Sequence, residues 1–223
     1  MLTRINFLTA GESHGRGLLG IIDGIPSGLE ISKKYIDVQL KRRQMGHGRG
    51  GRMKIENDAV EIWSGVRDGK TIASPIGLIV KNKDWENWKN KMSVEKMEKT
   101  PRKVTLPRPG HADLAGVEKY GFDDIRNVLE RSSARETTMR VALASVCRKL
   151  LGDIGIHVAS RVVQIHDIVD SSSIPSNFKI HKLNQLADKS PVRCLNRNIE
   201  KEMIQVINHA KSQGDSVGGV FEI

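Results

Sequence analysis

The sequence predicts an α+β fold. Several short apolar segments of strand length occur before residue 81, whereas two longer segments later in the chain repeat apolar residues every three or four positions, as amphipathic helices do. The two kinds of segment do not alternate in a regular β-α-β rhythm, so a parallel sheet built from crossover units is not indicated. With 223 residues, 38% of them apolar, the chain can bury a hydrophobic core.

The first part of the chain carries most of the strand segments. We expect strands over residues 5–8, 18–22 and 76–80, together with a hairpin in which residues 54–56 and 60–63 flank the turn dipeptide Asn57-Asp58. A helix is predicted to start after Ser32, a suitable N-cap, and to end near Gly46. Its last turn carries the basic residues Lys41, Arg42 and Arg43. Because cations suit the negative end of the helix dipole, helix stabilisation alone explains this basic cluster.

Residues 81–103 are predicted to form a surface excursion with a short helix, because the segment is charged and has no sustained apolar period. Trp85 and Trp88 lie three residues apart, and we expect them to pack together on one helix face. Aromatic side chains among lysines also occur where nucleic-acid bases stack, which keeps nucleic-acid binding as an alternative.

The second part of the chain carries two amphipathic helices. The first is predicted over residues 134–151, with Gly152 as its end and an apolar stripe formed by Met139, Leu143, Val146, Cys147 and Leu150. After a β-rich stretch at 156–168 and a polar loop at 171–177, the second is expected over residues 198–213, closed by Gly214. The final residues, VGGVFEI, resemble a strand that has just begun. We therefore expect the chain to be a piece of a longer protein.

The charge balance predicts an anionic partner. Lys and Arg total 36 against 26 for Asp and Glu, a net charge of +10, which suits nucleic acid, an acidic membrane surface or phosphorylated small molecules. The sequence has no apolar run long enough to span a membrane and no secretion signal, so we expect a soluble cytoplasmic protein. Cys147 and Cys194 have no C-x-x-C spacing, and the histidines have no metal-ligand spacing, so no metal site is predicted.

A glycine-rich basic segment, RRQMGHGRGGRM at residues 42–53, is the first candidate binding loop. Its four glycines let the backbone approach a ligand closely, and Arg43, Arg49 and Arg52 offer guanidinium groups suited to phosphates or carboxylates. A non-specific basic loop explains the same residues equally well.

Two histidines lie in glycine-containing turns. GESHGRG at residues 11–17 holds His14, and LPRPGHAD at residues 106–113 holds His111 in a segment stiffened by two prolines. Arg108 and Asp113 flank His111 and could tune an acid-base role, although a lone histidine is more often structural.

The segment ERSSARETT at residues 130–138 is the last candidate. Ser133 and Glu136 have the spacing of a capping box, so the helix at 134–151 should begin here and expose backbone N–H groups that can bind an anion. Arg131, Ser132, Ser133 and Arg135 could converge on a phosphate there. An ordinary capped helix with surface arginines remains the alternative. The chain has neither a G-x-x-x-x-G-K-[ST] loop nor a strand-to-helix G-x-G-x-x-G motif, so neither common nucleotide cradle is supported.

Taken together, these stretches resemble the chorismate synthase family. The matching segments are TAGESHGRG, RRQMGHGRGGRMKIENDAVEIWSGVRDGKTIASPIG, RPGHADLAGVEKYGFDDIRNVLERSSARETTMRVA and GDSVGGVFE. One departure is His47, which stands where the family is expected to have tyrosine; an imidazole can replace a phenol as a stacking or hydrogen-bonding surface, so a modest effect is expected. The other is length, because family members continue well past the VGGVFE region.

The resemblance implies a fold and an activity. The fold is a layered sandwich of helices between antiparallel sheets in a homotetramer, and residues 1–223 would be one chorismate synthase-like domain truncated at its C-terminal side. The implied reaction converts 5-enolpyruvylshikimate 3-phosphate to chorismate in the shikimate pathway, by 1,4-anti elimination of phosphate with reduced FMN that lends an electron transiently. NADPH is a candidate reductant. Nucleic acid and membranes are not expected partners of such an enzyme.

The resemblance also assigns roles to residues. His14 matches the histidine near the leaving phosphate, and His111 matches the one that protonates the reduced flavin. Cofactor-binding positions are Arg131, Ser132, Ser133, Arg43 and Arg49, and substrate-binding positions are Arg49, Arg108 and Arg135. Two other readings stay open: an inactive truncated remnant that keeps the fold, and a basic nucleic-acid-binding protein.

Overall fold

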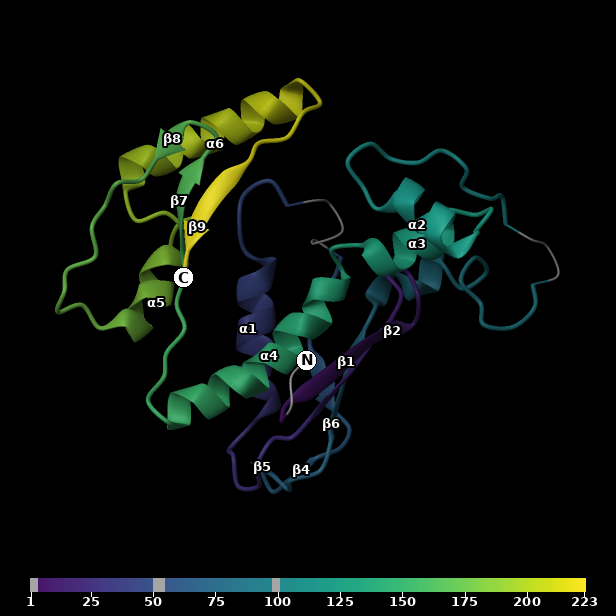
Figure 1. Ribbon diagram of the computed structural model, residues 1–223, viewed down its shortest axis with the longest axis horizontal. Helices are drawn as coiled ribbons and strands as arrows, with labels where there is room; N and C mark the ends of the chain where they lie inside the picture. Colours follow the sequence, from purple (N-terminus) through teal and green to yellow (C-terminus); the bar gives the residue numbers. More distant parts are fainter. Residues whose placement is uncertain (1–3, 50–54, 98–100) are drawn as a thin grey trace. The chain divides into compact units, whose positions relative to one another are not determined.

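The computed structural model describes residues 4–49, 55–97 and 101–223 (Figure 1). The chain forms two compact units. The first comprises the described residues of Met1–Arg43 and Lys54–Lys149, and the second those of Gln44–Met53 and Leu150–Ile223. The expectation of a single domain over residues 1–223 stays a prediction.

The first unit is built on a four-stranded antiparallel sheet. Its strands, in the order β1-β2-β6-β3, are β1 (Asn6–Gly11), β2 (Gly17–Asp23), β6 (Ile76–Lys81) and β3 (Val60–Ile62). A separate antiparallel ribbon joins β4 (Val66–Arg67) to β5 (Lys70–Thr71). Alternate residues of the central strands, such as Leu18, Ile22, Leu78 and Val80, are buried. One face of the sheet therefore forms the core, as the period-2 pattern of a half-buried strand requires.

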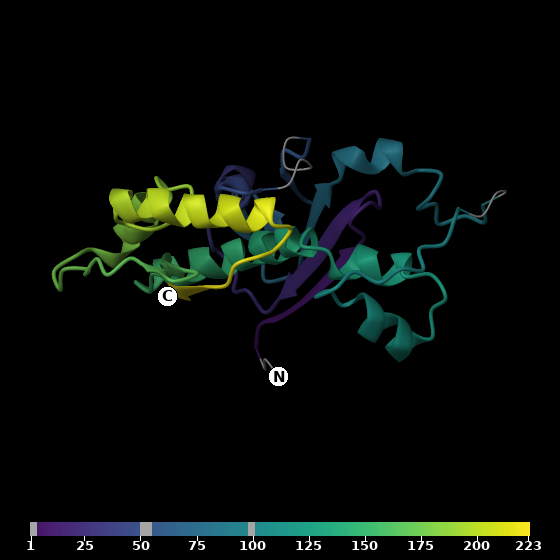
Figure 2. The ribbon, with the colours of Figure 1, turned by 90° about the horizontal axis from the view of Figure 1, so that it is seen from above.

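Helices α1 (Lys33–Gln44) and α4 (Glu136–Asp153) lie beside this sheet (Figure 1). Two further helices, α2 (Asp113–Tyr120) and α3 (Arg126–Ser132), belong to the same unit, and a short 3-10 helix, η2, spans Lys83–Asn87. Gly20 on β2 lets α4 approach closely, because a Cβ there would lie 2.6 Å from the sulfur of Met139. Gly116 on α2 does the same for α3, where a Cβ would lie 2.4 Å from Val128. Helices α2 and α3 lie side by side in both views (Figures 1 and 2).

The second unit pairs a three-stranded antiparallel sheet with a long helix. The sheet has the order β8-β7-β9, and the elements of this unit are β7 (Arg161–Ile165), β8 (Ile168–Val169), η3 (Ile180–Lys182), α5 (Leu183–Ala187), α6 (Arg197–Ser212) and β9 (Gly219–Glu222). Asn196 caps α6 by accepting the backbone N–H of Asn198 at 2.9 Å. Met203 on α6 is fully buried, and Ile165 and Ile168 of the sheet belong to the same apolar cluster.

The predicted α+β class is confirmed, since helices accompany sheets whose strand pairs are all antiparallel in the described chain. The predicted strands at 5–8, 18–22 and 76–80 and both long helices are present. Ser32 is the expected N-cap of α1, because its hydroxyl accepts the Tyr35 backbone N–H at 3.2 Å. Arg52 of the glycine-rich segment and Lys54 lie outside the described residues.

Four local predictions are wrong. No hairpin forms around Asn57-Asp58: residues 55–59 contain no strand, and β3 pairs with β6. The capping box does not form, because the Ser133 hydroxyl accepts from the Arg135 N–H and the Glu136 carboxylate accepts from Thr9 and Arg140.

The end of α4 and the ring contacts of Trp85 and Trp88 also differ from those predicted. Helix α4 runs past Gly152, and it is Gly155, with a φ of 82°, that adopts the left-handed conformation after the helix. The ring contacts of the two tryptophans are with other partners: Trp88 stacks on His14, and Trp85 lies under Arg16.

The described residues contain neither a membrane-spanning helix nor a cluster of metal ligands. None of their helices is long and apolar enough to cross a membrane. Within the same ranges, His, Cys, Asp and Glu side chains form no group of three that could hold a metal ion.

Candidate active site

The loop between β1 and β2 carries His14, and the buried side-chain amide of Asn82 holds this loop in place. The side-chain nitrogen of Asn82 donates to three carbonyl oxygens of the loop, those of Glu12, Ser13 and Gly15, at 3.0, 3.1 and 2.8 Å. The Ser13 backbone N–H donates to the Glu130 carbonyl oxygen at 3.0 Å. These bonds hold the turn against α3, so the position of His14 is defined by residues far away in the sequence.

Glu130 binds His14 twice. Its Oε2 accepts the backbone N–H of His14 at 2.7 Å, and its Oε1 lies 2.9 Å from the ring Nδ1. The carboxylate is buried, with 2% of its side chain exposed against 26% for His14. Burial favours a higher pKa for Glu130, but the hydrogen bonds and charge of His14 outweigh it, and the net pKa of this carboxyl is lowered.

An aromatic side chain lies on the imidazole. The rings of His14 and Trp88 stack, with centroids 4.0 Å apart and planes inclined by 30°. The Trp88 indole N–H donates to Asp84 at 3.1 Å, which orients the indole. Arg126 and Lys91 each place a cationic group 5.0 Å from the Trp88 ring. The result is a partly exposed imidazole among an aromatic ring, one carboxylate and two cations.

The predicted cofactor-binding residues of α3 adjoin this loop. The hydroxyl of Ser13 donates to that of Ser133 at 3.0 Å. Arg131 donates to the carbonyl oxygens of Gly11, at 2.7 Å, and Thr9. The Ser132 hydroxyl donates to the Val128 carbonyl at 2.7 Å. Ser133 and Arg131 thus lie beside the His14 loop, whereas the Ser132 hydroxyl is used within its own helix.

Arg135 lies in a buried ion cluster. It is 6% exposed, forms ion pairs with Asp58 and Glu56, and donates from Nε to the Asn82 oxygen at 2.9 Å. Arg43 approaches the same Asp58 at 3.5 Å and donates to the Ala134 carbonyl at 2.7 Å. The guanidinium of Arg135 is therefore engaged by the chain itself, and through Asn82 it supports the His14 loop.

The second predicted histidine forms a cluster at the start of α2. His111 Nδ1 lies 2.6 Å from Asp113, and Arg108 Nη2 lies 3.0 Å from each ring nitrogen. Arg108 also bonds the Asp113 carboxylate through Nε at 3.0 Å. The Arg108 side chain and then the other hydrogen bonds, against an opposing effect of burial, hold the pKa of Asp113 well below its usual range.

Arg49 and His47 belong to the second unit. Arg49 is exposed and donates from Nε to the Met45 carbonyl at 3.0 Å. The His47 ring nitrogen Nε2 lies 2.8 Å from the Asn208 side-chain oxygen, and its backbone N–H donates to Pro191. His47, which stands where a tyrosine was expected, thus forms a hydrogen bond with α6 through Asn208.

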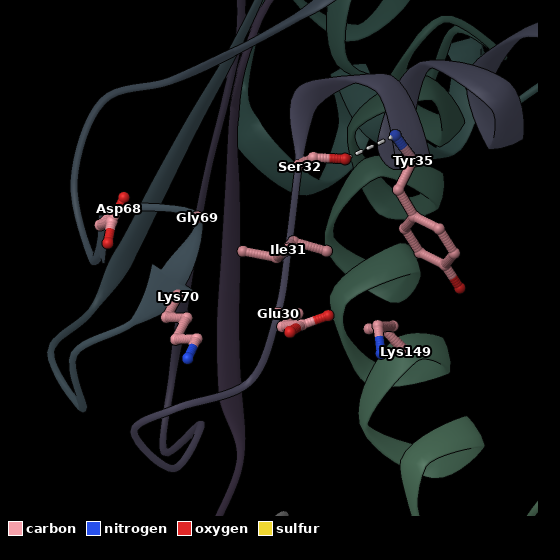
Figure 3. Close-up of a pocket in the computed structure, with 8 residues that line it drawn as sticks. All are labelled: Glu30, Ile31, Ser32, Tyr35, Asp68, Gly69, Lys70 and Lys149. Atoms are coloured by element: carbon pink, nitrogen blue, oxygen red, sulfur yellow. Dashed lines mark hydrogen bonds between the residues drawn. The ribbon is translucent and has the colours of Figure 1, made fainter.

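The first unit also has a pocket lined by residues of other segments (Figure 3). It encloses about 370 Å³. Its lining residues are Glu30, Ile31, Ser32, Tyr35, Asp68, Gly69, Lys70 and Lys149. None of the predicted site residues lines it, so it gives no support to the candidate site.

Comparison with known proteins decides the family. A family model described as Chorismate synthase matches residues 5–223. This chain belongs to the chorismate synthase family. The resemblance to this family that the sequence motifs indicated is therefore confirmed.

Relatives named chorismate synthase are similar along nearly the whole chain. The protein of Enterococcus faecalis (strain ATCC 700802 / V583) is 52% identical over 222 residues, and that of Chlorobium phaeovibrioides (strain DSM 265 / 1930) is 51% identical over 225. Each comparison covers 98% of this chain and 57% of the relative, so the chain spans little more than half of their length. A crystal structure of a chorismate synthase superposes with a TM-score of 0.77 at 38% identity, covering 99% of this chain and 58% of the other.

Sequence reasoning did not assign roles to Glu130, Trp88 and Asn82. Glu130 lies two residues before the end of α3, in the same segment as the predicted Ser132 and Ser133, and that position was its only sequence signal. For Asn82 no sequence signal was available, because its three acceptors lie about 70 residues earlier and are backbone atoms. For Trp88 the only signal was its position in a charged segment, which does not indicate a histidine partner.

Proposed function

We propose that the whole protein to which this chain belongs is a chorismate synthase, a carbon-oxygen lyase of the shikimate pathway. It converts 5-enolpyruvylshikimate 3-phosphate to chorismate by a 1,4-anti elimination, in which a carbon-oxygen bond to phosphate and a ring carbon-hydrogen bond break and a second ring double bond forms. The family match over residues 5–223 is the observation that carries this proposal.

The His14 cluster supplies the acid for the departing phosphate. Its imidazole is fixed by Glu130, and its exposed fraction allows contact with a ligand. A proton on Nε2 neutralises the charge that develops on the leaving oxygen. Cations nearby, of which Arg126 is 3.5 Å from Glu130, favour an anionic ligand.

The other predicted residues divide into two groups. His111 holds a proton for the cofactor, with Arg108 and Asp113 fixing its ring. Substrate binding by Arg108 and by Arg49 is proposed from the family resemblance alone. Arg135 we now assign to support of the site, because it is buried in its own ion cluster.

The residues present fit a phosphate-bearing flavin in the chemistry of their donors. Arg131, Ser133 and Arg43 present guanidinium and hydroxyl groups near the start of α4, which suit a phosphate better than a neutral ring. When bound, reduced FMN supplies electron density to the elimination without net redox change. NADPH as its reductant, a homotetramer and a cytoplasmic location belong to the same proposal.

The test is turnover with 5-enolpyruvylshikimate 3-phosphate and reduced FMN under anaerobic conditions, measured as chorismate formed. In a full-length relative, replacing His14 or His111 by alanine is expected to lower kcat by about 100-fold or more, with a smaller change in KM. Variants that turn over at the parent rate would contradict the assigned roles. Turnover by the full-length relative but not by the 223-residue chain would favour an inactive remnant. Tight, salt-dependent binding of mixed DNA without turnover would favour the nucleic-acid alternative.

A further inference from the structure

We propose that Glu130 and Trp88 are positioning residues for His14, and that together they hold its ring so that Nε2 is the atom that meets a phosphate-bearing ligand. The proposal rests on the proposed function for the acid role of His14. The fixed orientation of the ring itself follows from contacts within the chain and is testable without catalysis.

The Glu130 carboxylate determines which ring nitrogen carries the proton. Its two oxygens receive two donors of His14, the backbone N–H at 2.7 Å and the ring Nδ1 at 2.9 Å. An ionised carboxylate only accepts hydrogen bonds, and the lowered pKa of Glu130 keeps it ionised at neutral pH. Nδ1 must therefore be the donor. In the neutral ring Nε2 is then the acceptor, and in the protonated ring Nε2–H is the proton available to a ligand.

Trp88 fixes the plane of the same ring. Its indole stacks on the imidazole at 4.0 Å and is oriented by the bond from its N–H to Asp84. Arg126 links the two positioning residues, because its guanidinium lies 5.0 Å from the Trp88 ring and its Nη1 lies 3.5 Å from Glu130. Among the described residues, the charged groups against the His14–Trp88 pair are Glu130 and Arg126, with Lys91 beside the indole and Asp84 accepting its N–H. Two contacts in different directions leave the imidazole little freedom to rotate about its side-chain bonds.

The Glu130→Gln substitution distinguishes a role in orienting the His14 ring from a role in packing α3. Glu130→Gln keeps the volume of the side chain, but one of its two terminal atoms becomes a donor. The amide nitrogen can accept neither His14 donor, so a single uncharged oxygen must serve both the backbone N–H and Nδ1, and the negative charge beside the ring is lost. The orientation of the ring should then vary while α3 keeps its packing.

Tryptophan fluorescence of the 223-residue chain reads this arrangement directly, because a protonated imidazole in contact with an indole quenches its emission. We expect wild-type emission to fall as the pH is lowered through the imidazole titration, and Trp88→Phe and His14→Gln each to abolish the transition. Trp85→Phe is the matched control and should keep it. Glu130→Gln should reduce the quenching amplitude, because a neutral amide holds the protonated ring against the indole less firmly than a carboxylate does. Retention of the transition in Trp88→Phe, or a Glu130→Gln curve that matches the wild type, would overturn the proposal.

Turnover in the full-length relative gives the second readout. Glu130→Gln is expected to lower kcat about 10- to 100-fold with KM nearly unchanged, as loss of an orienting partner does elsewhere. If His14→Gln turns over normally while the fluorescence coupling is present, the proposed function of His14 fails and the positioning stands. If His14→Gln is inactive but Glu130→Gln matches the wild type in both assays, the positioning role fails and the proposed function stands.

Discussion

Replacing Arg135 by methionine should strongly destabilise the first unit. Arg135 is 6% exposed, and its partners Asp58 and Glu56 have side-chain exposures of 0% and 2%. Methionine keeps much of the volume but leaves two buried carboxylates without this cation. Removing one partner of a buried ion pair costs about 3–5 kcal/mol. Because Arg43 still lies 3.5 Å from Asp58, we expect the lower end, about 3 kcal/mol.

Urea unfolding followed by tryptophan emission measures this cost. The three tryptophans, Trp63, Trp85 and Trp88, all belong to the first unit, so the signal reports on that unit. With a slope of about 2 kcal/mol per molar urea, a loss of about 3 kcal/mol lowers the midpoint by about 1.5 M. The slope should stay constant, because the substitution does not alter the surface exposed on unfolding.

A matched control lies on α4. Arg140 pairs with Glu136 four residues away, but 56% of its side chain is exposed. Arg140→Met should therefore cost only about 0.5 kcal/mol. If Arg135→Met is within about 1 kcal/mol of the wild type, Arg135 does not have the structural role assigned to it. A variant of normal stability with weakened phosphate binding would restore the substrate-binding role implied by the family resemblance.

Two further substitutions test the His111 cluster and the helix pair that carries it. Asp113→Asn should cost about 1–3 kcal/mol at pH 7. The pKa of Asp113 in the folded chain lies well below its usual 3.8, so this stabilisation is present above about pH 4 and declines as the pH falls below that; the difference between the urea midpoints of variant and wild type should shrink over the same range. Gly116→Ala should cost about 1–3 kcal/mol by driving a methyl group against Val128, and Val128→Ala in the same chain should remove most of that added cost. Independent, additive effects of the two changes would contradict the close packing of α2 on α3.

Local patterns predicted the regular elements well. Alternating apolar residues located β2 and β6, and the Ser32 cap located the start of α1, because each depends on neighbours within a few residues. The apolar period of the second long helix located α6, whose Met203 is fully buried.

Long-range contacts explain the local predictions that are wrong. Asp58 resembles a turn residue, but Arg135, 77 residues later, binds it in the interior. Glu136 has the spacing of a capping box, but Thr9, 127 residues earlier, donates to its carboxylate at 2.7 Å. A sequence pattern covers a few residues and cannot indicate such partners.

The same distinction between local patterns and long-range contacts applies to the candidate site. His14, His111 and the flanking Arg108 and Asp113 were found from their short motifs. Glu130 binds His14 from 116 residues away. The sequence alone did not indicate this role, because the segment ERSS at residues 130–133 has several ordinary explanations.

The ring nitrogens of His14 offer the most direct test of the central claim. In the 223-residue chain labelled with nitrogen-15 histidine, with His14→Gln used for assignment, the imidazole spectrum identifies which nitrogen is protonated. We predict a neutral ring with the proton on Nδ1, and an Nε2 resonance that moves when 5-enolpyruvylshikimate 3-phosphate is added. A neutral ring protonated on Nε2, or an Nε2 resonance that the substrate leaves unchanged, would contradict the account.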